Sequence, residues 1–131
     1  ETGVRAIFDG AVNSDRYLLT YKNAGHNAGA PYPVPVELLN AEDTTASSHY
    51  TDPVWDNTRM NNIMDHFATV YFDHYLKQIE GRESYLDVIP DGADAVYSVT
   101  RGQHRDDHTY WKGFGPNTAI GLKLERRQPG E

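Results

Sequence analysis

The chain has 131 residues, of which 38% are hydrophobic and 24% charged, so we expect a globular protein rather than a disordered one. Its net charge of −7 argues against a nucleic-acid partner, because phosphate binding needs a concentrated basic surface. Without cysteine, the chain has no disulfide, zinc–thiolate site or cysteine nucleophile. No apolar run approaches the roughly 20 residues of a membrane span, so we expect no membrane partner. The sequence also indicates no cofactor. The compartment is not determined, and a soluble, cytoplasmic protein is slightly favoured.

The N-terminal residues predict a helix that leads into a strand. The helix covers residues 2–12, where apolar side chains recur at helical spacing: Val4, Ile7, Phe8 and Ala11. Residues 16–22 are nearly continuous in apolar character, as expected of a strand that is covered on both faces in a parallel sheet. A helix followed by such a strand is the closing half of an α/β unit. We therefore expect the α/β class, or α+β if the chain is an isolated fragment.

Residues 23–51 form a long segment without a convincing regular element. Its prolines, Pro31, Pro33 and Pro35, predict a stiff extended stretch. Residues 37–41 fit one helical turn, and residues 41–48 are typical of a polar loop. A loop of this length is unusual in a compact domain and often carries function.

The strongest predicted helix covers residues 52–80, with Asp52 as N-cap, Pro53 in the first turn and Gly81 as the stop. Because this helix would be long, we expect a break near residues 56–58. Its apolar side chains keep to one helical face: Met60, Ile63, Met64, Phe67, Ala68, Tyr71, Phe72, Tyr75, Leu76 and Ile79. Its polar side carries Asn62, His66, Thr69, Asp73 and Lys77.

The rest of the chain predicts shorter elements. Residues 83–89 favour a short helix, and strands are predicted over residues 95–100, 109–114 and 119–125. Residues 101–108 are typical of a charged loop. The sequence thus predicts a segment of residues 1–80 with a β-rich extension of residues 81–131, together one compact unit.

His26 is the candidate catalytic residue. It lies in a loop of Asn, Ala and Gly that directly follows the strand of residues 16–22. A structural role is the alternative, because loop histidines often only bind a neighbouring backbone group. The order of strand, His loop and long helix matches the end of an α/β-hydrolase, whose triad runs nucleophile, acid, histidine along the chain. There the histidine is the general base that takes the proton of the nucleophile.

Four segments carry a resemblance to one family: residues 23–27 (NAGHN), 51–57 (TDPVWDN), 60–67 (MNNIMDHF) and 72–77 (FDHYLK). They resemble the His loop, the segment after it and the C-terminal helix of α/β-hydrolases in the bacterial dienelactone-hydrolase-like group. The resemblance covers roughly residues 1–80. It implies hydrolysis of an ester or lactone through an acyl-enzyme, with His26 as general base. Its supporting loop residues would be Asn23, Gly25 and Asn27.

The chain departs from this family in what it lacks. No serine is flanked as in the Gly-x-Ser-x-Gly elbow, the glycine-spaced segment of residues 25–29 has Asn27 at that place, and the oxyanion-hole loop is missing. The triad acid should lie just before Glu1, since Asp9 and Asp15 sit at the wrong end of the strand. Because these parts act as a unit, we expect the isolated chain to be inactive.

Other histidines are weaker candidates. His104 and His108 enclose two aspartates, and His and carboxylate groups can bind divalent metals. However, a spacing of four residues aligns two ligands only on a helix, so a solvated charged loop is the preferred interpretation. His66 and His74 each follow an aspartate, and we expect both on the solvated face of the long helix.

Two partners follow from these interpretations. The chain begins with Glu1 rather than Met, so we expect a processed product or a piece whose N-terminal hydrolase half is missing. The strand and the apolar helix face both need partners, which favours a homo-oligomer, most simply a dimer. The alternative function is a non-catalytic α+β module for dimerisation or ligand binding.

Overall fold

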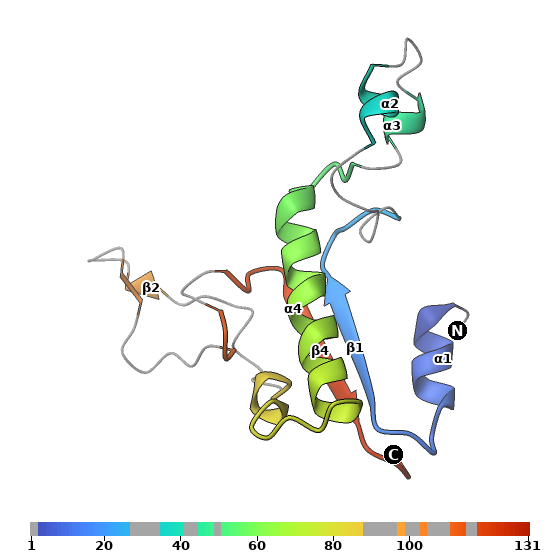
Figure 1. The fold of residues 1–131 in the computed structure, drawn as a ribbon, viewed down its shortest axis with the longest axis vertical. Helices are drawn as coiled ribbons and strands as arrows, with labels where there is room; N and C mark the ends of the chain where they lie inside the picture. The colour runs from blue at the N-terminus through green and yellow to red at the C-terminus, as the bar shows by residue number, and fades with distance from the viewer. Residues whose placement is uncertain are drawn as a thin grey trace. The chain divides into compact units, whose positions relative to one another are not determined.

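A computed structural model describes residues 3–26, 35–40, 45–48, 51–87, 97–98, 103–104, 111–114 and 118–131 (Figure 1). These residues form helices and two-stranded antiparallel sheets, which is compatible with the α+β class. The chain divides into two groups of contacting residues, Glu1–Lys22 with Asp87–Glu131, and Asn23–Leu86. The boundary expected after residue 80, between a hydrolase-like segment and an extension, remains a prediction.

The elements follow the predicted order closely in the first two thirds of the chain. The helix α1 and the strand β1 lie where periodicity placed them, and a helical turn, α2, occurs near residues 37–41. A second helical turn, α3, lies in the stretch predicted as a polar loop, so that prediction was wrong there. The elements are α1 Val4–Gly10, β1 Arg16–Tyr21, α2 Val36–Leu39, α3 Thr45–Ser48, α4 Asn57–Tyr75, the 3₁₀ turn η1 Glu83–Tyr85, β2 Tyr97–Ser98, β3 Gln103–His104 and β4 Leu122–Arg127.

The strand β1 pairs antiparallel with β4, from Arg16 opposite Arg127 to Tyr21 opposite Leu122 (Figure 1). The predicted parallel pairing is therefore wrong for this pair of strands. In β4, Leu122 and Leu124 are buried while Lys123 between them is exposed, the alternation of a strand with one covered face. An apolar run such as that of β1 indicates a strand, but it does not specify the direction of the strand's neighbour.

Arg16 joins the two ends of this group of residues. Its side chain is buried, and its guanidinium donates hydrogen bonds to backbone carbonyls of residues that precede β1 and of residues that follow β4. Nη1 lies 3.1 Å from the Ser14 carbonyl oxygen, Nη2 lies 2.6 Å from the Glu131 carbonyl oxygen, and Nε binds the Phe8 carbonyl. A longer contact of 3.4 Å joins Nη1 to the Gln128 carbonyl oxygen. One cation thus satisfies several carbonyls that no helix or sheet pairs.

Ion pairs add to the contact between α1 and β4. Arg5 donates two hydrogen bonds to the Glu125 carboxylate, at 3.1 and 2.6 Å, and Lys123 lies 3.2 Å from the same group. The hydrogen bond from Arg5 is the main cause that holds the pKa of the Glu125 carboxyl below its usual range, and partial burial acts in the opposite direction.

We expect a replacement of Glu125 by glutamine to reduce the acid sensitivity of this group of residues. Because the pKa of Glu125 is lowered in the folded chain, its contribution to stability is present above the ordinary value of 4.5 and is lost as the pH falls through the folded-state pKa. Urea unfolding at about pH 6 and about pH 3 should show a smaller loss of stability in Glu125→Gln than in the wild type. An equal loss in both proteins would contradict this role.

The helix α4 starts later than predicted, with Asp56 rather than Asp52 as its N-cap. The Asp56 carboxylate accepts a hydrogen bond from the Arg59 amide at 2.7 Å. The expected break near residues 56–58 is instead the start of the helix. After Tyr75 the chain turns through two left-handed residues, Gln78 at φ 54° and Gly81 at φ 76°.

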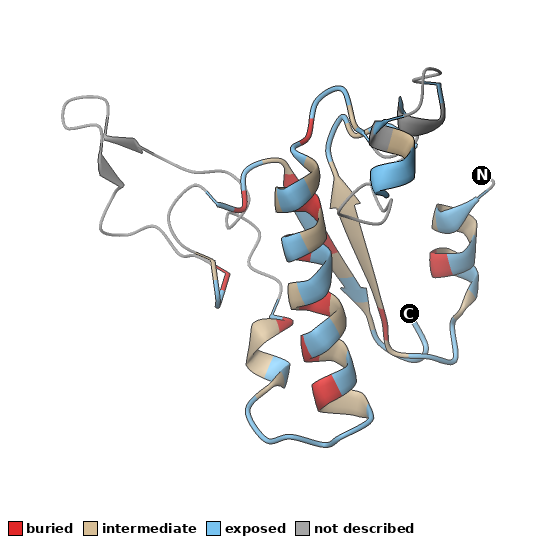
Figure 2. Cartoon of the chain, turned by 45° about the horizontal axis from the view of Figure 1, so that its top comes forward, coloured by how far each residue is buried: buried red, intermediate tan, exposed pale blue. Residues whose placement is uncertain are grey.

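The buried face of α4 matches the predicted stripe only in part; Figure 2 colours this helix by burial. Its buried residues are Met60, Ile63, Phe67, Val70 and Asp73. Met64, Phe72 and Leu76 follow each other at multiples of four residues and are exposed. The predicted stripe thus combined two faces, because ten apolar residues in the twenty positions from Met60 to Ile79 cover more than one side of a helix.

The described parts of the C-terminal region correct several strand predictions. Residues 111–114 form a turn, in which the Phe114 amide binds the Trp111 carbonyl at 2.9 Å and Gly113 has φ 91°. Gly121, at φ 82°, lies in the turn before β4, so that strand begins later than predicted. β2 lies within the predicted strand of residues 95–100, while β3 lies in the stretch predicted as a loop.

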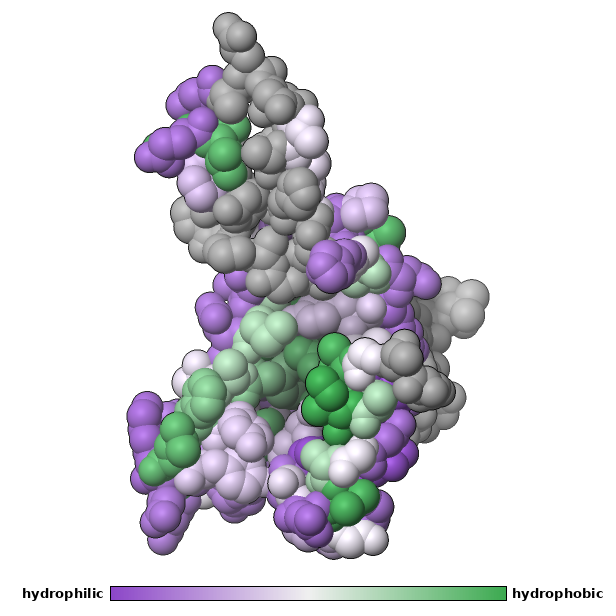
Figure 3. Space-filling model, turned by 90° about the vertical axis from the view of Figure 1, so that its right-hand side faces the viewer, coloured by the Kyte–Doolittle hydropathy of each residue, from purple (hydrophilic) through white to green (hydrophobic). Residues whose placement is uncertain are grey.

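Apolar side chains remain on the surface (Figure 3). The most exposed large ones are Val4 and Ile7 on α1 and Leu76 after α4. Of the predicted apolar face of α1, only Phe8 is buried, and the guanidinium of Arg16 lies 5.5 Å from its ring centre. Within the part of the chain that the structure describes, no helix is both long and apolar enough to cross a membrane.

Candidate functional site

His26 lies in an exposed turn that follows β1. The hydrogen bonding between β1 and β4 continues by one bond past the end of β1, where the Lys22 amide donates to the Gly121 carbonyl at 2.7 Å. Asn23 then adopts a left-handed conformation at φ 61°, which asparagine tolerates better than most residues. Both Asn23 and His26 are exposed, so a reacting group could reach the imidazole from solvent. The third predicted loop residue, Asn27, lies outside the described residues.

Asp52 holds the loop immediately before His26. Its Oδ2 accepts a hydrogen bond from the Gly25 amide at 2.6 Å, although 27 positions separate the two residues. Its Oδ1 accepts from the Val54 and Trp55 amides at 2.9 and 2.8 Å. Burial raises the pKa of the Asp52 carboxyl, but the three backbone hydrogen bonds together lower it below its usual range. The carboxylate is thus a shared acceptor for two separate stretches of backbone.

Glycine suits position 25 because of this contact. A Cβ atom there would lie 3.1 Å from Asp52 Oδ2, tighter than nine in ten Cβ contacts in proteins. The side chain of Asp52 would therefore have to shift if any other residue replaced Gly25. The sequence predicted Gly25 as a supporting loop residue, and the structure shows the close approach of a carboxylate at this position.

Contacts with the start of α4 hold Asp52 in place. The Asp52 amide donates to Asn57 Oδ1 at 3.2 Å, and Asn57 is the first residue of α4. Trp55 is buried, and the guanidinium of Arg59 lies 4.6 Å from its ring centre. Asp52 is therefore part of an ordered turn rather than a free surface group. The sequence signal for such a turn was an aspartate directly before Pro53.

The two aspartates considered as in-chain triad acids are engaged elsewhere. Asp15 forms paired hydrogen bonds with Arg126 at 2.9 and 2.7 Å, and Asp9 lies 3.2 Å from Arg127. Among the residues that the structure describes, none forms a hydrogen bond or ion pair with the His26 side chain. The described chain thus presents a base without an orienting acid or nucleophile beside it.

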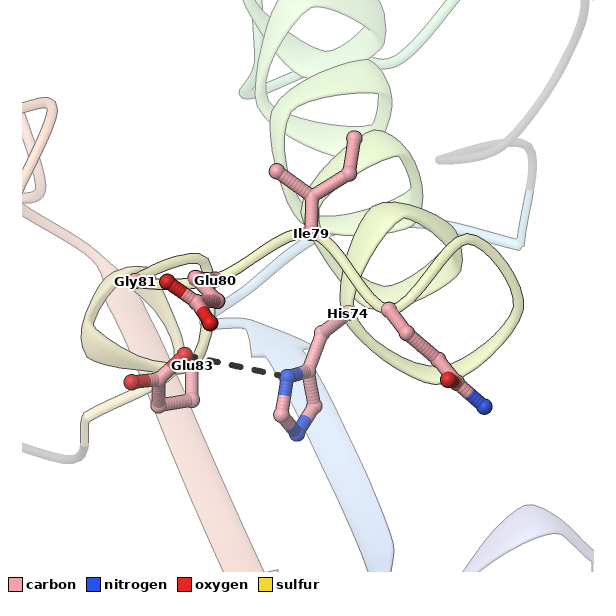
Figure 4. Close-up of a pocket in the computed structure, with 6 residues that line it drawn as sticks. His74, Ile79, Glu80, Gly81 and Glu83 are labelled. Atoms are coloured by element: carbon pink, nitrogen blue, oxygen red, sulfur yellow. Dashed lines mark ion pairs between the residues drawn. The ribbon is translucent and has the colours of Figure 1, made fainter.

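A second candidate site is a pocket beyond the end of α4 (Figure 4). It is a hollow open to solvent with a volume of about 600 Å³, within the usual range for ligand pockets. His74 Nδ1 lies 3.8 Å from Glu83 Oε2 across it. The lining residues are His74, Gln78, Ile79, Glu80, Gly81 and Glu83. Two carboxylates and the C-terminal end of a helix favour a positively charged group there.

Asp73 supports this end of α4 from inside. Its side chain is buried and lies 2.7 Å from Lys77 Nζ and 3.5 Å from Arg82 Nε. The hydrogen bond from Lys77 is the main cause that lowers the pKa of the Asp73 carboxyl, with burial opposing it and the charge of Arg82 adding to it. The expectation that Asp73 lies on the polar side of the helix was wrong, because two cations compensate its burial.

Among the residues that the structure describes, the remaining histidines do not form a metal site. His66 is half-buried, with its ring centre 5.0 Å from that of Phe67, and burial lowers the pKa of its imidazole. The expectation of a fully solvated His66 was therefore wrong. His104 lies on β3 and His108 outside the described residues. Among the described residues, no group of three His, Asp or Glu side chains could hold a metal ion.

Comparison of the chain with protein-family models, with curated proteins and with solved structures gave no match.

Proposed function

We propose that this chain supplies His26 as the general base of an ester or lactone hydrolase with the α/β-hydrolase fold, of the dienelactone-hydrolase-like group. The observation that carries the proposal is the anchored loop. An exposed imidazole directly follows a glycine whose backbone is fixed by Asp52, at the end of a strand. Catalytic side chains often lie on such loops, because a rigid scaffold then sets the direction of the side chain.

The strand arrangement supports the same proposal. β4 pairs with one edge of β1, and among the described residues no other strand pairs with its second edge. A parallel strand from a missing N-terminal half would pair along that second edge. β4 would then be an additional strand at the margin of a hydrolase sheet.

In the proposed reaction, His26 first accepts a proton and then returns it. A hydroxyl nucleophile from outside this chain attacks the substrate carbonyl, and its proton passes to His26. His26 then returns that proton to the leaving oxygen as the C–O bond breaks, which leaves an acyl-enzyme. Water repeats the cycle, with His26 taking the proton of the attacking water and the nucleophile leaving as its hydroxyl. Stabilisation of the oxyanion must also come from outside the chain.

The test compares the product of the whole gene with the isolated chain. With a short-chain p-nitrophenyl ester, we expect no turnover by the isolated chain. In the whole product we expect His26→Ala to lower kcat/KM by at least about a thousandfold, as loss of a triad member does. His74→Ala is the control, because His74 lies in the pocket beyond α4 and should leave kcat/KM within about twofold. Turnover by the isolated chain that His26→Ala abolishes would contradict the proposed division of the site.

The second candidate function is a non-catalytic module for ligand binding or dimerisation. The pocket lined by His74, Glu80 and Glu83 favours ligand binding, and a small cationic molecule fits its charge. The exposed apolar residues of α4, Met64 and Phe72 among them, favour a dimer that covers them. A whole gene product without hydrolase activity would favour this second function.

A further inference from the structure

We propose that Asp52 is the positioning residue of the His26 loop: its carboxylate fixes the Gly25 backbone and so the direction in which His26 leaves the turn. Two stretches of backbone converge on it. Gly25 binds one oxygen, and the Val54 and Trp55 amides bind the other. As a role in catalysis this rests on the proposed function, whereas the anchoring itself can be measured without it.

The chemistry of the contact requires a carboxylate. Three amide donors face one side chain, and an ionised carboxylate offers only acceptors. An asparagine at position 52 would offer one acceptor oxygen, and its NH₂ group would face an amide donor at the other end. It could therefore satisfy either Gly25 or the Val54 and Trp55 pair, but not both. The 2.6 Å distance to Gly25 is short, as expected for a charge-assisted bond.

The position of the contact makes it relevant to His26. The Gly25 amide belongs to the peptide plane between Ala24 and Gly25, so fixing it holds the backbone one residue before His26 and limits the conformations on the N-terminal side of His26. The other end of the anchor is the turn that leads into α4, a helix of 19 residues with a buried face. The backbone before His26 is thus held in place by the turn at the start of α4, and not by the loop alone.

A purely local role for Asp52 is the competing explanation. Its bonds to Val54 and Trp55 form an Asx turn, and such turns occur in many loops without any site nearby. Asp56 provides the matched control, because it also binds a backbone amide near the start of α4, that of Arg59, and makes no contact with Gly25. A difference between variants at these two aspartates isolates the contact with the His26 loop.

The experiment measures amide hydrogen exchange and chemical shifts by NMR in the full 131-residue chain. In Asp52→Asn we expect exchange of the Gly25 amide to accelerate by about tenfold or more, the factor for loss of one hydrogen bond of ordinary strength. The His26 amide should sharpen its signal toward that of a mobile loop. In Asp56→Asn both signals should stay as in the wild type, while the Arg59 amide exchanges faster.

The pH profile of the wild type gives a readout that needs no variant. The folded-state pKa of Asp52 is lowered, so the contact should persist above the ordinary value of 3.8 and open as the pH falls through that lower pKa. The Gly25 amide shift should follow this titration and should not do so in Asp52→Asn. Among the described residues of the two segments, the neighbouring ionisable side chains are Lys22, His26, Asp56 and Arg59, and the Asp56→Asn profile removes that of Asp56.

Each outcome decides the proposal. Unchanged Gly25 exchange in Asp52→Asn, or a wild-type Gly25 shift that ignores the carboxyl titration, would overturn it. If Gly25 is released but His26→Ala leaves a whole gene product fully active, the anchor stands and the proposed function fails. If that product depends on His26 but Asp52→Asn leaves both kcat and Gly25 exchange unchanged, the function stands and the positioning role fails.

Discussion

Replacement of Arg16 by methionine should destabilise the group of residues built on β1 and β4 by about 3 kcal/mol or more. The methionine side chain keeps most of the apolar contacts but leaves the Phe8, Ser14 and Glu131 carbonyls without their donor. The contact with the Phe8 carbonyl is buried, and a buried acceptor that loses a charged donor costs more free energy than an ordinary hydrogen bond contributes. Urea unfolding monitored through the amide resonances of β1 and β4 measures the effect in this group alone.

Arg126→Gln is the control for that experiment. Arg126 also belongs to the sheet pair and also binds with its guanidinium, but its partner is the Asp15 carboxylate at the surface. Exposed ion pairs contribute no more than about 1 kcal/mol, so this variant should unfold close to the wild type. A loss of less than about 1 kcal/mol in Arg16→Met would show that water replaces the guanidinium, and our account of Arg16 would be wrong.

The second large effect is expected at Met60. Its side chain is 1% exposed, and its replacement by alanine should cost about 2–5 kcal/mol of stability in α4, through lost burial and the cavity that remains. Met64, one helical turn later, is 42% exposed, and Met64→Ala should change stability by less than about 1 kcal/mol. Urea unfolding followed by helical circular dichroism compares the two variants. The same chemical change is thus tested on the two faces of one helix.

The outcome at Met64 also bears on the proposed dimer. If two copies cover the exposed face of α4, Met64→Ala should weaken their association, which light scattering over a range of concentrations can measure. If both variants destabilised the monomer equally, the finding that Met60 is buried and Met64 exposed would be contradicted. If the wild type is a monomer at all concentrations and Met64→Ala does not change its mass by light scattering, the dimer is contradicted.

Periodicity predicted the helices and the first strand because it reports local structure. The helical spacing of Val4, Ile7 and Phe8 located α1, and the apolar run after Arg16 located β1. It located the buried face of α4 only in part: Met60, Ile63 and Phe67 are buried as predicted, but apolar residues occur on two sides of that helix and only tertiary contacts choose between them. It also could not give the partner of β1, because strand pairing depends on segments far apart in the chain.

The candidate site was predicted in part for the same reason. The loop composition around Gly25 and the place of His26 after a strand are local signals, and the structure places His26 in an exposed turn. The contact between Gly25 and Asp52 is not local, so Asp52 was interpreted as a helix cap, the role that Asp56 fills.

The pairing of β1 with β4 has a consequence for the order of events during synthesis. About 100 residues separate the end of β1 from the start of β4, so at roughly 5–20 residues per second the first strand waits about 5–20 s for its partner. During that time Arg16 also lacks the carbonyls of Gln128 and Glu131. The segment Asn23–Leu86 is synthesised before β4, and its residues contact one another as one group. A nascent chain should therefore be able to form α4 and its caps first, while β1 lacks β4 along one edge until residues 122–127 have been made.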